Sequence, residues 1–235
     1  MRVVALIPAY NEADYIEQTI TAVASLHYVD EIMVINDGSK DDTAALVQKQ
    51  KEALSKKVTL INLRANRGKG AALNSGLRSA SGDVYLLLDA DLGDTASLAQ
   101  GLLEPVLHDQ ADMSIARFGV QQSASGVKMG MGLVRRTACR GVRLLTGRII
   151  SSPLSGQRAI KALVLQTLGD FFEGFGVEVG LTVGALHHGF RIVEIPLEMK
   201  HRAYGRGFGG FWHRGRQWVQ VVRALWRCWR RGWHL

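Results

Sequence analysis

Apolar and polar residues alternate in blocks along the first 90 residues of the chain. Short apolar runs over 3–10, 31–37, 58–63 and 84–88 have the length and β-branched content of strands. The segments between them, 12–26, 41–54 and 69–80, repeat apolar residues at a helical period. Strands that alternate with helices at this spacing predict right-handed crossovers and a parallel sheet.

The second half of the chain predicts fewer elements. Helices are expected over 132–148 and 176–189, and a strand over 190–199. The predicted fold class is therefore α/β, with a mostly parallel, Rossmann-like sheet flanked by helices. We expect this domain to span residues 1–209 and to be followed by an amphipathic C-terminal helix over 210–235.

Polar and glycine-rich residues gather where each of the first four predicted strands ends. The strand ends read PAYNE, NDGSKDD, RANRGKG and DADLGD. In open α/β sheets, ligands bind beyond the carboxyl ends of the strands, so we expect these segments to form one ligand-binding edge. Arg67, Lys69 and the backbone N–H groups of the glycine-rich segment are suited to binding a phosphate.

Two carboxylates one residue apart, Asp89 and Asp91, end the fourth predicted strand. They repel each other unless a cation or hydrogen-bond donors lie between them. In an extended segment both project to the same side, and Mg²⁺ or Mn²⁺ commonly bridges such carboxylates to substrate phosphates. The pair therefore predicts a divalent cation, although an Asp-x-Asp triplet taken alone is also typical of a solvated turn.

The formal net charge of +8 over 235 residues favours an anionic partner: nucleic acid, a phosphorylated substrate or lipid headgroups. The chain has neither a Walker A loop nor a Gly-x-Gly-x-x-Gly at the first strand, which weakens ATPase and dinucleotide-binding functions. Cys139 and Cys228 are too few for a disulfide framework and suit a cytoplasmic protein. Neither a signal peptide nor a membrane-spanning segment is expected.

Aromatic and basic residues concentrate near the C-terminus. From Gln217 a helical period places Trp218, Val222, Leu225, Trp226, Trp229 and Trp233 on one face, with Arg223, Arg227, Arg230 and Arg231 opposite. A basic amphipathic helix with tryptophans is typical of a helix that lies on a membrane surface. The alternatives are a helix docked on the protein's own core or one at a homodimer interface. We expect a cytoplasmic protein held peripherally at the inner face of the membrane.

The segment 132–148 carries a second group of arginines. Its basic residues surround an apolar stripe and are Arg135, Arg136, Arg140, Arg143 and Arg148. They either face a phosphorylated acceptor or form the solvated face of a helix.

Four motifs follow one another over residues 3–91: LIPAYNEADYIEQTI, VINDGSKDDT, NRGKGAALNSGL and SGDVYLLLDAD. Together they resemble the successive signatures of family 2 glycosyltransferases with the GT-A fold. The similarity continues less sharply over 153–160, 174–197 and 200–206, which resemble the polyprenol-phosphate sugar synthases and the sugar-phosphoglycerate synthases of that family. The resemblance implies a nucleotide-sugar donor and Mg²⁺ or Mn²⁺ as the cofactor.

The resemblance also implies roles for individual residues. Those implied to bind the nucleotide are Pro8, Ala9, Tyr10, Glu12, Asp37, Lys69, Gly70, Asp89 and Arg206. Asp37 would accept a hydrogen bond from the base, while Asp91 would bind the metal directly and Asp89 would contact the ribose or the metal. His201 would be a third metal ligand, as in the sugar-phosphoglycerate synthases. The structural alternatives are that Asp37 caps the following turn and that Lys69 is a solvated helix residue.

The candidate catalytic residues are Asp91 and, in the second half of the chain, Glu178 and Arg202. Glu178 lies within the apolar pattern of a predicted helix, where a carboxylate is costly unless paired. It either faces the acceptor pocket or forms a salt bridge with an arginine. Arg202 and Arg206 lie in a glycine-rich segment that suits a mobile lid over a phosphate, or else forms a solvated loop.

The predicted function is metal-dependent transfer of a sugar from a UDP- or GDP-linked donor to a phosphorylated acceptor. A polyprenyl phosphate or other lipid acceptor at the membrane surface is favoured, because such a phosphate is already an anionic nucleophile and requires no general base. A small acceptor such as phosphoglycerate is the second possibility. A basic nucleic-acid-binding or regulatory module is the alternative from another class; because no known nucleic-acid motif is present, we expect no nucleic-acid partner.

Overall fold

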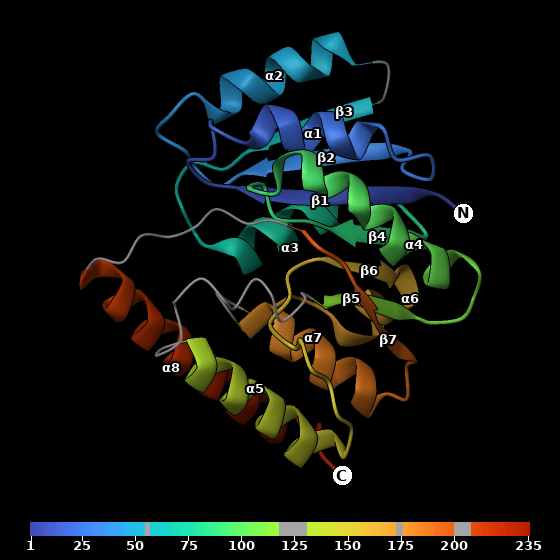
Figure 1. Cartoon of the computed structure of the whole chain (residues 1–235), viewed down its shortest axis with the longest axis vertical. Helices are drawn as coiled ribbons and strands as arrows, with labels where there is room; N and C mark the ends of the chain where they lie inside the picture. The colour runs from blue at the N-terminus through green and yellow to red at the C-terminus, as the bar shows by residue number, and fades with distance from the viewer. Residues whose placement is uncertain (55–56, 118–130, 173–175, 200–207) are drawn as a thin grey trace.

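The computed structural model describes residues 1–54, 57–117, 131–172, 176–199 and 208–235, and contains one seven-stranded sheet with helices on both faces (Figure 1). The strands are β1 (Val3–Ala9), β2 (Glu31–Asn36), β3 (Lys57–Asn62), β4 (Val84–Leu87), β5 (Met113–Arg117), β6 (Arg158–Lys161) and β7 (Ile192–Pro196). Their order across the sheet is β3-β2-β1-β4-β6-β5-β7. The first four are parallel, and β6 runs antiparallel to both of its neighbours. The predicted α/β class with a mostly parallel sheet is confirmed.

Alternation along the strands divides the core into two layers. On β1, Val4 and Leu6 pack into one cluster, while Ala5 and Ile7 pack into the other, because successive side chains point to opposite faces of a sheet. One face is covered by α1 (Ile16–Ala24), α2 (Thr43–Ala53), the 3₁₀ helix η1 (Gly93–Ala99) and α4 (Gln100–Leu107). The other is covered by α3 (Lys69–Ser79), α5 (Met131–Thr146), α6 (Ala162–Leu168), α7 (Gly176–His187) and α8 (Phe208–Arg230).

The predicted elements of the first half agree with the structure to within a few residues at each end. In the second half, β5 and the short antiparallel β6 were not predicted. The four residues of β6 include a fully buried arginine, Arg158. Neither the length nor the apolar content of this segment distinguishes it as a strand, and pairing with β4 and β5 is what makes it one.

Helices α5 and α8 form an outer layer on the far side of α7 (Figure 1). They run parallel: Thr137 contacts Trp218, Gly141 lies against Leu225, and Gly147 lies beside Leu235. A Cβ at Gly141 would stand 2.3 Å from the Leu225 side chain, so glycine is needed for this close approach. The C-terminal helix begins at Phe208, earlier than the tryptophan pattern indicated.

The faces of α8 differ from the prediction. The side chains that it buries are Val221, Ala224 and Cys228, while Trp218, Val222, Trp226 and Trp229 stay exposed. Assigning Leu225 to the exposed tryptophan face was wrong, because it packs against Gly141. Assigning Trp233 to it was also wrong: the helix ends at Arg230, and Gly232 at φ +75° turns the chain. Trp233 then stacks on Phe172, with ring centroids 6.0 Å apart.

The arginines near the C-terminus do not all lie on one side of the chain: Arg223 and Arg227 line a hollow between α8 and α7, whereas Arg230 lies over an exposed tryptophan. The Arg230 guanidinium lies 4.9 Å from the centre of the Trp226 ring, and that of Arg231 lies 4.7 Å from the Phe172 ring. Within the described part of the chain, no helix is both long enough and apolar enough to cross a bilayer.

Candidate active site

The loops after β1 and β2 are tied together at the carboxyl edge of the sheet. Asn11 adopts a left-handed conformation (φ 56°); its side-chain oxygen accepts the Lys40 N–H at 2.8 Å, and its own N–H donates to the Ser39 hydroxyl at 3.0 Å. The Glu12 N–H donates to the Thr43 hydroxyl at 2.9 Å. These bonds fix the segment predicted to line the nucleotide pocket, which leads from Ala9, buried at the end of β1, to the exposed Tyr10.

Asp37 anchors the loop after β3. Its carboxylate is buried and accepts the backbone N–H groups of Arg67 at 2.9 Å and Gly68 at 2.7 Å. Gly38 (φ +71°) allows the close approach, because a Cβ there would stand 2.8 Å from the Ala65 backbone. Asp37 therefore occupies two of the backbone N–H groups that were expected to be available to a phosphate. The structural alternative, in which Asp37 caps the turn that follows it, was wrong, because the Asp37 carboxylate bonds to the loop after β3.

The chain turns directly after β4. Residues 90 and 91 form a turn, so the expectation of an extended Asp-Ala-Asp segment was wrong. The buried Thr19 of α1 fixes this turn: its hydroxyl donates to the Ala90 carbonyl at 2.8 Å and accepts the Gly93 N–H at 2.9 Å. Thr19 was not predicted as part of the site. Sequence pattern could not reveal it, because it lies some seventy residues from the turn that it holds.

A partly buried charge cluster links this turn to α3 and α7. The Lys69 ammonium donates to Asp89 Oδ1 at 2.7 Å and to Glu178 Oε1 at 2.8 Å. Gln157 donates from its side-chain amide to Asp89 Oδ2 at 2.6 Å. Lys69 is therefore not a solvated helix residue, and Glu178 pairs with this lysine rather than with an arginine. Gly70, the next residue, is buried in the first turn of α3.

The electrostatics of the cluster keep the lysine charged. Burial acts to lower the pKa of Lys69, but the charges of Asp89 and Glu178 and their hydrogen bonds outweigh it and raise that pKa well above its ordinary value. Glu178 is only 4% exposed, and its second oxygen, Oε2, has no hydrogen-bond partner among the described residues. A buried carboxylate oxygen of this kind is costly unless a ligand or water donates to it.

The half-buried Glu194 and the fully buried Arg158 hold the loop that carries Gln157. Glu194 of β7 accepts the N–H and hydroxyl of Ser151 at 3.0 and 2.7 Å, and the Ser152 N–H at 2.7 Å. Arg158 donates to the carbonyls of Ser155 and Pro153 and, at 2.9 Å, to the Thr182 hydroxyl one turn after Glu178. Burial lowers the pKa of Arg158 to about 10, against the opposing charges of Glu178 and Glu194.

Gly156 closes the cluster from the same loop. A Cβ at this position would stand 2.5 Å from the Lys69 ammonium and 2.8 Å from Asp89 Oδ2. Any side chain would therefore push the lysine and the carboxylate apart. Gly156 and Gln157 were both missed as site residues, although they belong to the PLSGQRAI segment that carries part of the family resemblance.

The residues at the turn after β4 fit a divalent cation in part. Both oxygens of Asp89 already accept hydrogen bonds, from Lys69 and Gln157, whereas Asp91 is half-buried at the open edge of the sheet. Within the described ranges, no group of three or more His, Cys, Asp or Glu side chains forms a metal site. Mg²⁺ commonly takes only one or two protein carboxylates together with substrate phosphates and waters. His201, like Arg202 and Arg206, lies outside the described residues.

Comparison with known proteins identifies the chain. The sequence profile of "Glycosyl transferase family 2" matches residues 4–162, and the chain belongs to this family. The poly-beta-1,6-N-acetyl-D-glucosamine synthase of Staphylococcus aureus (strain MSSA476) is 31% identical over 222 residues, which are 92% of this chain and 53% of that protein. The chain thus spans about half the length of the curated relatives that it matches over most of its own length.

Solved structures of the glucosyl-3-phosphoglycerate synthase from Mycobacterium tuberculosis share the GT-A fold. One, in complex with Mn²⁺, UDP-glucose and phosphoglyceric acid, has a TM-score of 0.75 and 25% sequence identity, covering 95% of this chain and 79% of that one. Another, with Mg²⁺ and UDP, has a TM-score of 0.72 and 26% identity, covering 95% and 78%. The predicted family and GT-A fold are therefore confirmed.

Proposed function

We propose that this protein is a metal-dependent glycosyltransferase that moves one sugar from a nucleotide-sugar donor, UDP- or GDP-linked, to a phosphorylated acceptor. The observation that carries this proposal is the cluster at the carboxyl edge of the sheet. Asp91 and the Lys69–Asp89–Glu178 group stand there together, where open α/β sheets bind their ligands. Relatives that bind UDP and UDP-glucose in the same fold support a nucleotide-sugar donor.

Asp91 would hold Mg²⁺ or Mn²⁺, with His201 as a second protein ligand. Asp89 would act mainly through its hydrogen bonds, because Lys69 and Gln157 already occupy its two oxygens. When bound, the metal supplies positive charge that neutralises the leaving diphosphate. The complexes of the structural relative with Mn²⁺ and with Mg²⁺ support this cofactor.

Glu178 would contact the transferred sugar. Its Oε1 is held by Lys69, and its buried Oε2 is available to accept a hydrogen bond from a sugar hydroxyl. Such a bond would remove the cost of leaving this oxygen without a donor. Lys69 would hold Glu178 and Asp89 in place through its two hydrogen bonds, rather than contact the diphosphate itself.

Around the donor, Pro8, Ala9, Tyr10 and Glu12 would line the nucleotide pocket, and Asp37 would bind the base. The bonds from Arg67 and Gly68 leave the Asp37 oxygens with further acceptor capacity. Arg202 and Arg206 would bind the reacting phosphates. In the transfer, an acceptor oxygen bonds to the sugar's anomeric carbon as the bond to the diphosphate breaks, and the nucleoside diphosphate leaves.

A polyprenyl phosphate or other lipid is the acceptor that we favour. The exposed tryptophans of α8 support it, because such residues are enriched where proteins meet membranes. A lipid phosphate is also an anionic nucleophile that requires no general base. The second candidate acceptor is phosphoglycerate, favoured by the structural relative that binds phosphoglyceric acid.

A two-stage experiment tests the donor and then the acceptor. Thermal shift with UDP, GDP and their sugars, each with and without Mn²⁺, should give a metal-dependent rise in Tm for one nucleotide series. The stabilising donor is then incubated with a short polyprenyl phosphate in detergent or with 3-phosphoglycerate, and the products are separated by mass spectrometry. Sugar transfer to phosphoglycerate but not to the polyprenyl phosphate would make phosphoglycerate the acceptor in place of a lipid. A Tm that no nucleotide raises would overturn the proposed function.

A further inference from the structure

Helices α5 and α8 expose large apolar side chains where the rest of the described chain mostly buries them. The exposed apolar residues on or beside these helices are Leu133, Leu144, Ile149, Trp218, Val219, Val222, Trp226 and Trp229. Trp226 is 52% exposed, Trp229 57% and Leu144 79%. Scattered single apolar residues are ordinary on protein surfaces, but such a concentration on two adjacent helices indicates a binding surface.

The exposed residues of the two helices adjoin. Trp218 donates from its indole N–H to the Thr137 hydroxyl of α5 at 3.1 Å. Leu133 lies four residues before Thr137 and Leu144 seven after it, so all three share one face of α5. That face therefore continues into the tryptophan face of α8. We name the exposed apolar residues, together with the described arginines of both helices, the α5–α8 surface; these arginines are Arg135, Arg136, Arg140, Arg143, Arg223, Arg227 and Arg230.

The charge of this surface has a single sign. The sequences of α5 and α8 contain four and five arginines and no aspartate or glutamate. Arg230 lies over the Trp226 ring, so basic and aromatic groups are interleaved. A symmetric dimer would bring this patch against itself, placing arginines against arginines with no acidic partner from either helix. The charge therefore disfavours a second copy of the chain as the occupant.

We propose that the α5–α8 surface docks on an anionic lipid bilayer. Tryptophan rings are suited to the headgroup region, and arginines extend from it toward lipid phosphates. Each basic residue near an anionic membrane surface contributes about 1 kcal/mol. The sequence predicted one interfacial helix, whereas the structure assigns two parallel helices to a single docking surface.

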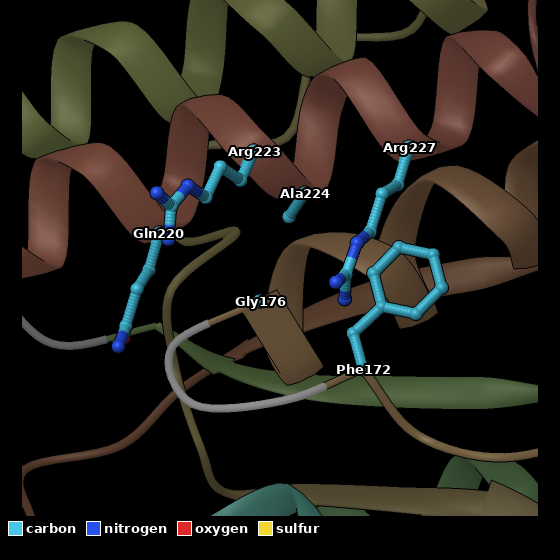
Figure 2. A pocket seen from close by; sticks show the side chains of 6 residues that line it. All are labelled: Phe172, Gly176, Gln220, Arg223, Ala224 and Arg227. Carbon is cyan, nitrogen blue, oxygen red and sulfur yellow. The ribbon is translucent and has the colours of Figure 1, made fainter.

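Docking would bring lipid headgroups close to the candidate active site. A hollow lies between α8 and the start of α7, lined by Phe172, Gly176, Gln220, Arg223, Ala224 and Arg227 (Figure 2). The side chains of Arg223 and Arg227 extend from α8 toward it. Gly176 stands two residues before Glu178, so the hollow reaches the first turn of the helix that carries this site residue. This step, unlike the docking itself, rests on the proposed lipid acceptor.

The test is co-sedimentation of the full chain with vesicles of phosphatidylcholine alone or with 30% phosphatidylglycerol. We expect binding to the anionic vesicles only. Arg223→Gln with Arg227→Gln should weaken it about thirty-fold, because two contributions of about 1 kcal/mol are lost. Trp226→Ser with Trp229→Ser should weaken it at least tenfold. The controls remove two charges or two exposed apolar side chains elsewhere: Lys49→Gln with Lys51→Gln on α2, and Tyr28→Ser with Leu98→Ser.

Three outcomes would overturn the docking proposal. They are no vesicle binding by the intact protein, equal losses in the control variants, or a dimer in solution that the tryptophan variants convert to monomers. Nucleotide binding by thermal shift, measured on the same samples, separates this inference from the proposed function. Vesicle binding without nucleotide binding would support the docking proposal and contradict the proposed glycosyltransferase function. Nucleotide binding without vesicle binding would support the proposed function and contradict the docking proposal.

Discussion

The carboxyl edge of the sheet and the α5–α8 surface depart from ordinary burial in opposite ways. At the sheet edge, the ammonium of the partly buried Lys69 pairs with the partly buried Asp89 and the buried Glu178. On α8, small side chains such as Ala224 are buried, while Trp226 and Trp229 stay in contact with solvent. Buried charge is expensive unless paired, and exposed aromatic area is unfavourable unless a partner covers it. Each departure from ordinary burial therefore indicates a binding role.

Substitutions in the two regions should also affect stability and function differently. Side chains at the sheet edge are coupled through shared hydrogen bonds, so changing one affects stability and site geometry together. The exposed Trp226 and Trp229 of α8 belong to neither buried core cluster. Changing them should affect docking with little cost to folding. The following predictions test this contrast, from the largest expected effect to the smallest.

Asp91→Ala should lower turnover about a thousandfold or more while the protein remains folded. The metal that Asp91 would hold supplies several kcal/mol of charge stabilisation in the transition state, and each 1.36 kcal/mol is a factor of ten in rate. Turnover is measured with the donor identified by thermal shift. The control is Asp94→Ala, an exposed carboxylate three residues later. Normal turnover of Asp91→Ala, or undiminished wild-type turnover in EDTA, would contradict the metal assignment.

Lys69→Met should lower the free energy of unfolding by about 3 kcal/mol, because it leaves the buried Glu178 and the partly buried Asp89 without the cation that pairs with both. Urea denaturation followed by circular dichroism measures this loss. The control is Lys49→Met, which removes a lysine from an exposed pair with Glu17. It should change the free energy of unfolding by less than about 1 kcal/mol. Equal effects of the two substitutions would mean that the cluster is no more coupled than a surface ion pair.

Gly156→Ala should lower kcat/KM about a hundredfold, because its Cβ would displace the Lys69 ammonium or Asp89, and a misplacement of about 1 Å can cost that much in rate. The donor titration separates KM from kcat. Gly215→Ala, on α8 with open space around the added Cβ, is the matched control and should leave kcat/KM unchanged. A fall in Tm with normal kinetics would make Gly156 a packing residue only.

On α8, the smaller side chain should matter more for stability. Val221→Ala opens a cavity in the core and should cost about 1–3 kcal/mol of the free energy of unfolding. Trp226→Ala removes a much larger but half-exposed side chain and should cost less than about 1 kcal/mol. Both values come from urea denaturation. The reverse order would show that the tryptophan face contributes to the core rather than to a docking surface.

The pairing of charges can also be tested at the exposed end of β5 and β7, where we expect the smallest effect. Hydrogen bonds from Arg191 and Lys161 outweigh burial and hold the pKa of Asp112 well below its ordinary value of 3.8. A depressed pKa stabilises the fold above the ordinary value and loses this contribution as pH falls below it. The Tm difference between wild type and Asp112→Asn should therefore shrink between about pH 5 and pH 2. A difference that stays constant would contradict this linkage, and Arg191→Met should reproduce the convergence.

Sequence pattern predicted the first half of the fold well because its signals are local. Each strand from β1 to β4 is a continuous apolar run, and each helix between them repeats at its own period. The same pattern placed Asp89, Asp91, Asp37 and Lys69 at one edge, since parallel strands present their carboxyl ends together. It could not predict that Lys69 would reach Glu178, because this contact joins helices 109 residues apart in the chain.

The positions that were wrong or missed depend on contacts across the fold. Thr19, Gly156 and Gln157 have ordinary local surroundings in the sequence and become part of the site only through partners on other elements. Arg158 reads as a surface residue until the fold buries it against backbone carbonyls and Thr182. Leu225 fits the periodicity of the tryptophan face, but the glycine at position 141 of a neighbouring helix allows it to pack there and become partly buried.

The sequence alone determined the fold class, the family and the edge of the sheet that carries the candidate site, because these follow from periodicity and from motifs with fixed local spacing. The tertiary structure decided which charges meet and which face of α8 is covered. Side-chain pairing over long separations depends on how the helices pack, and packing depends on the shapes of residues such as Gly141 and Gly156. A pattern read along one chain segment does not contain that information.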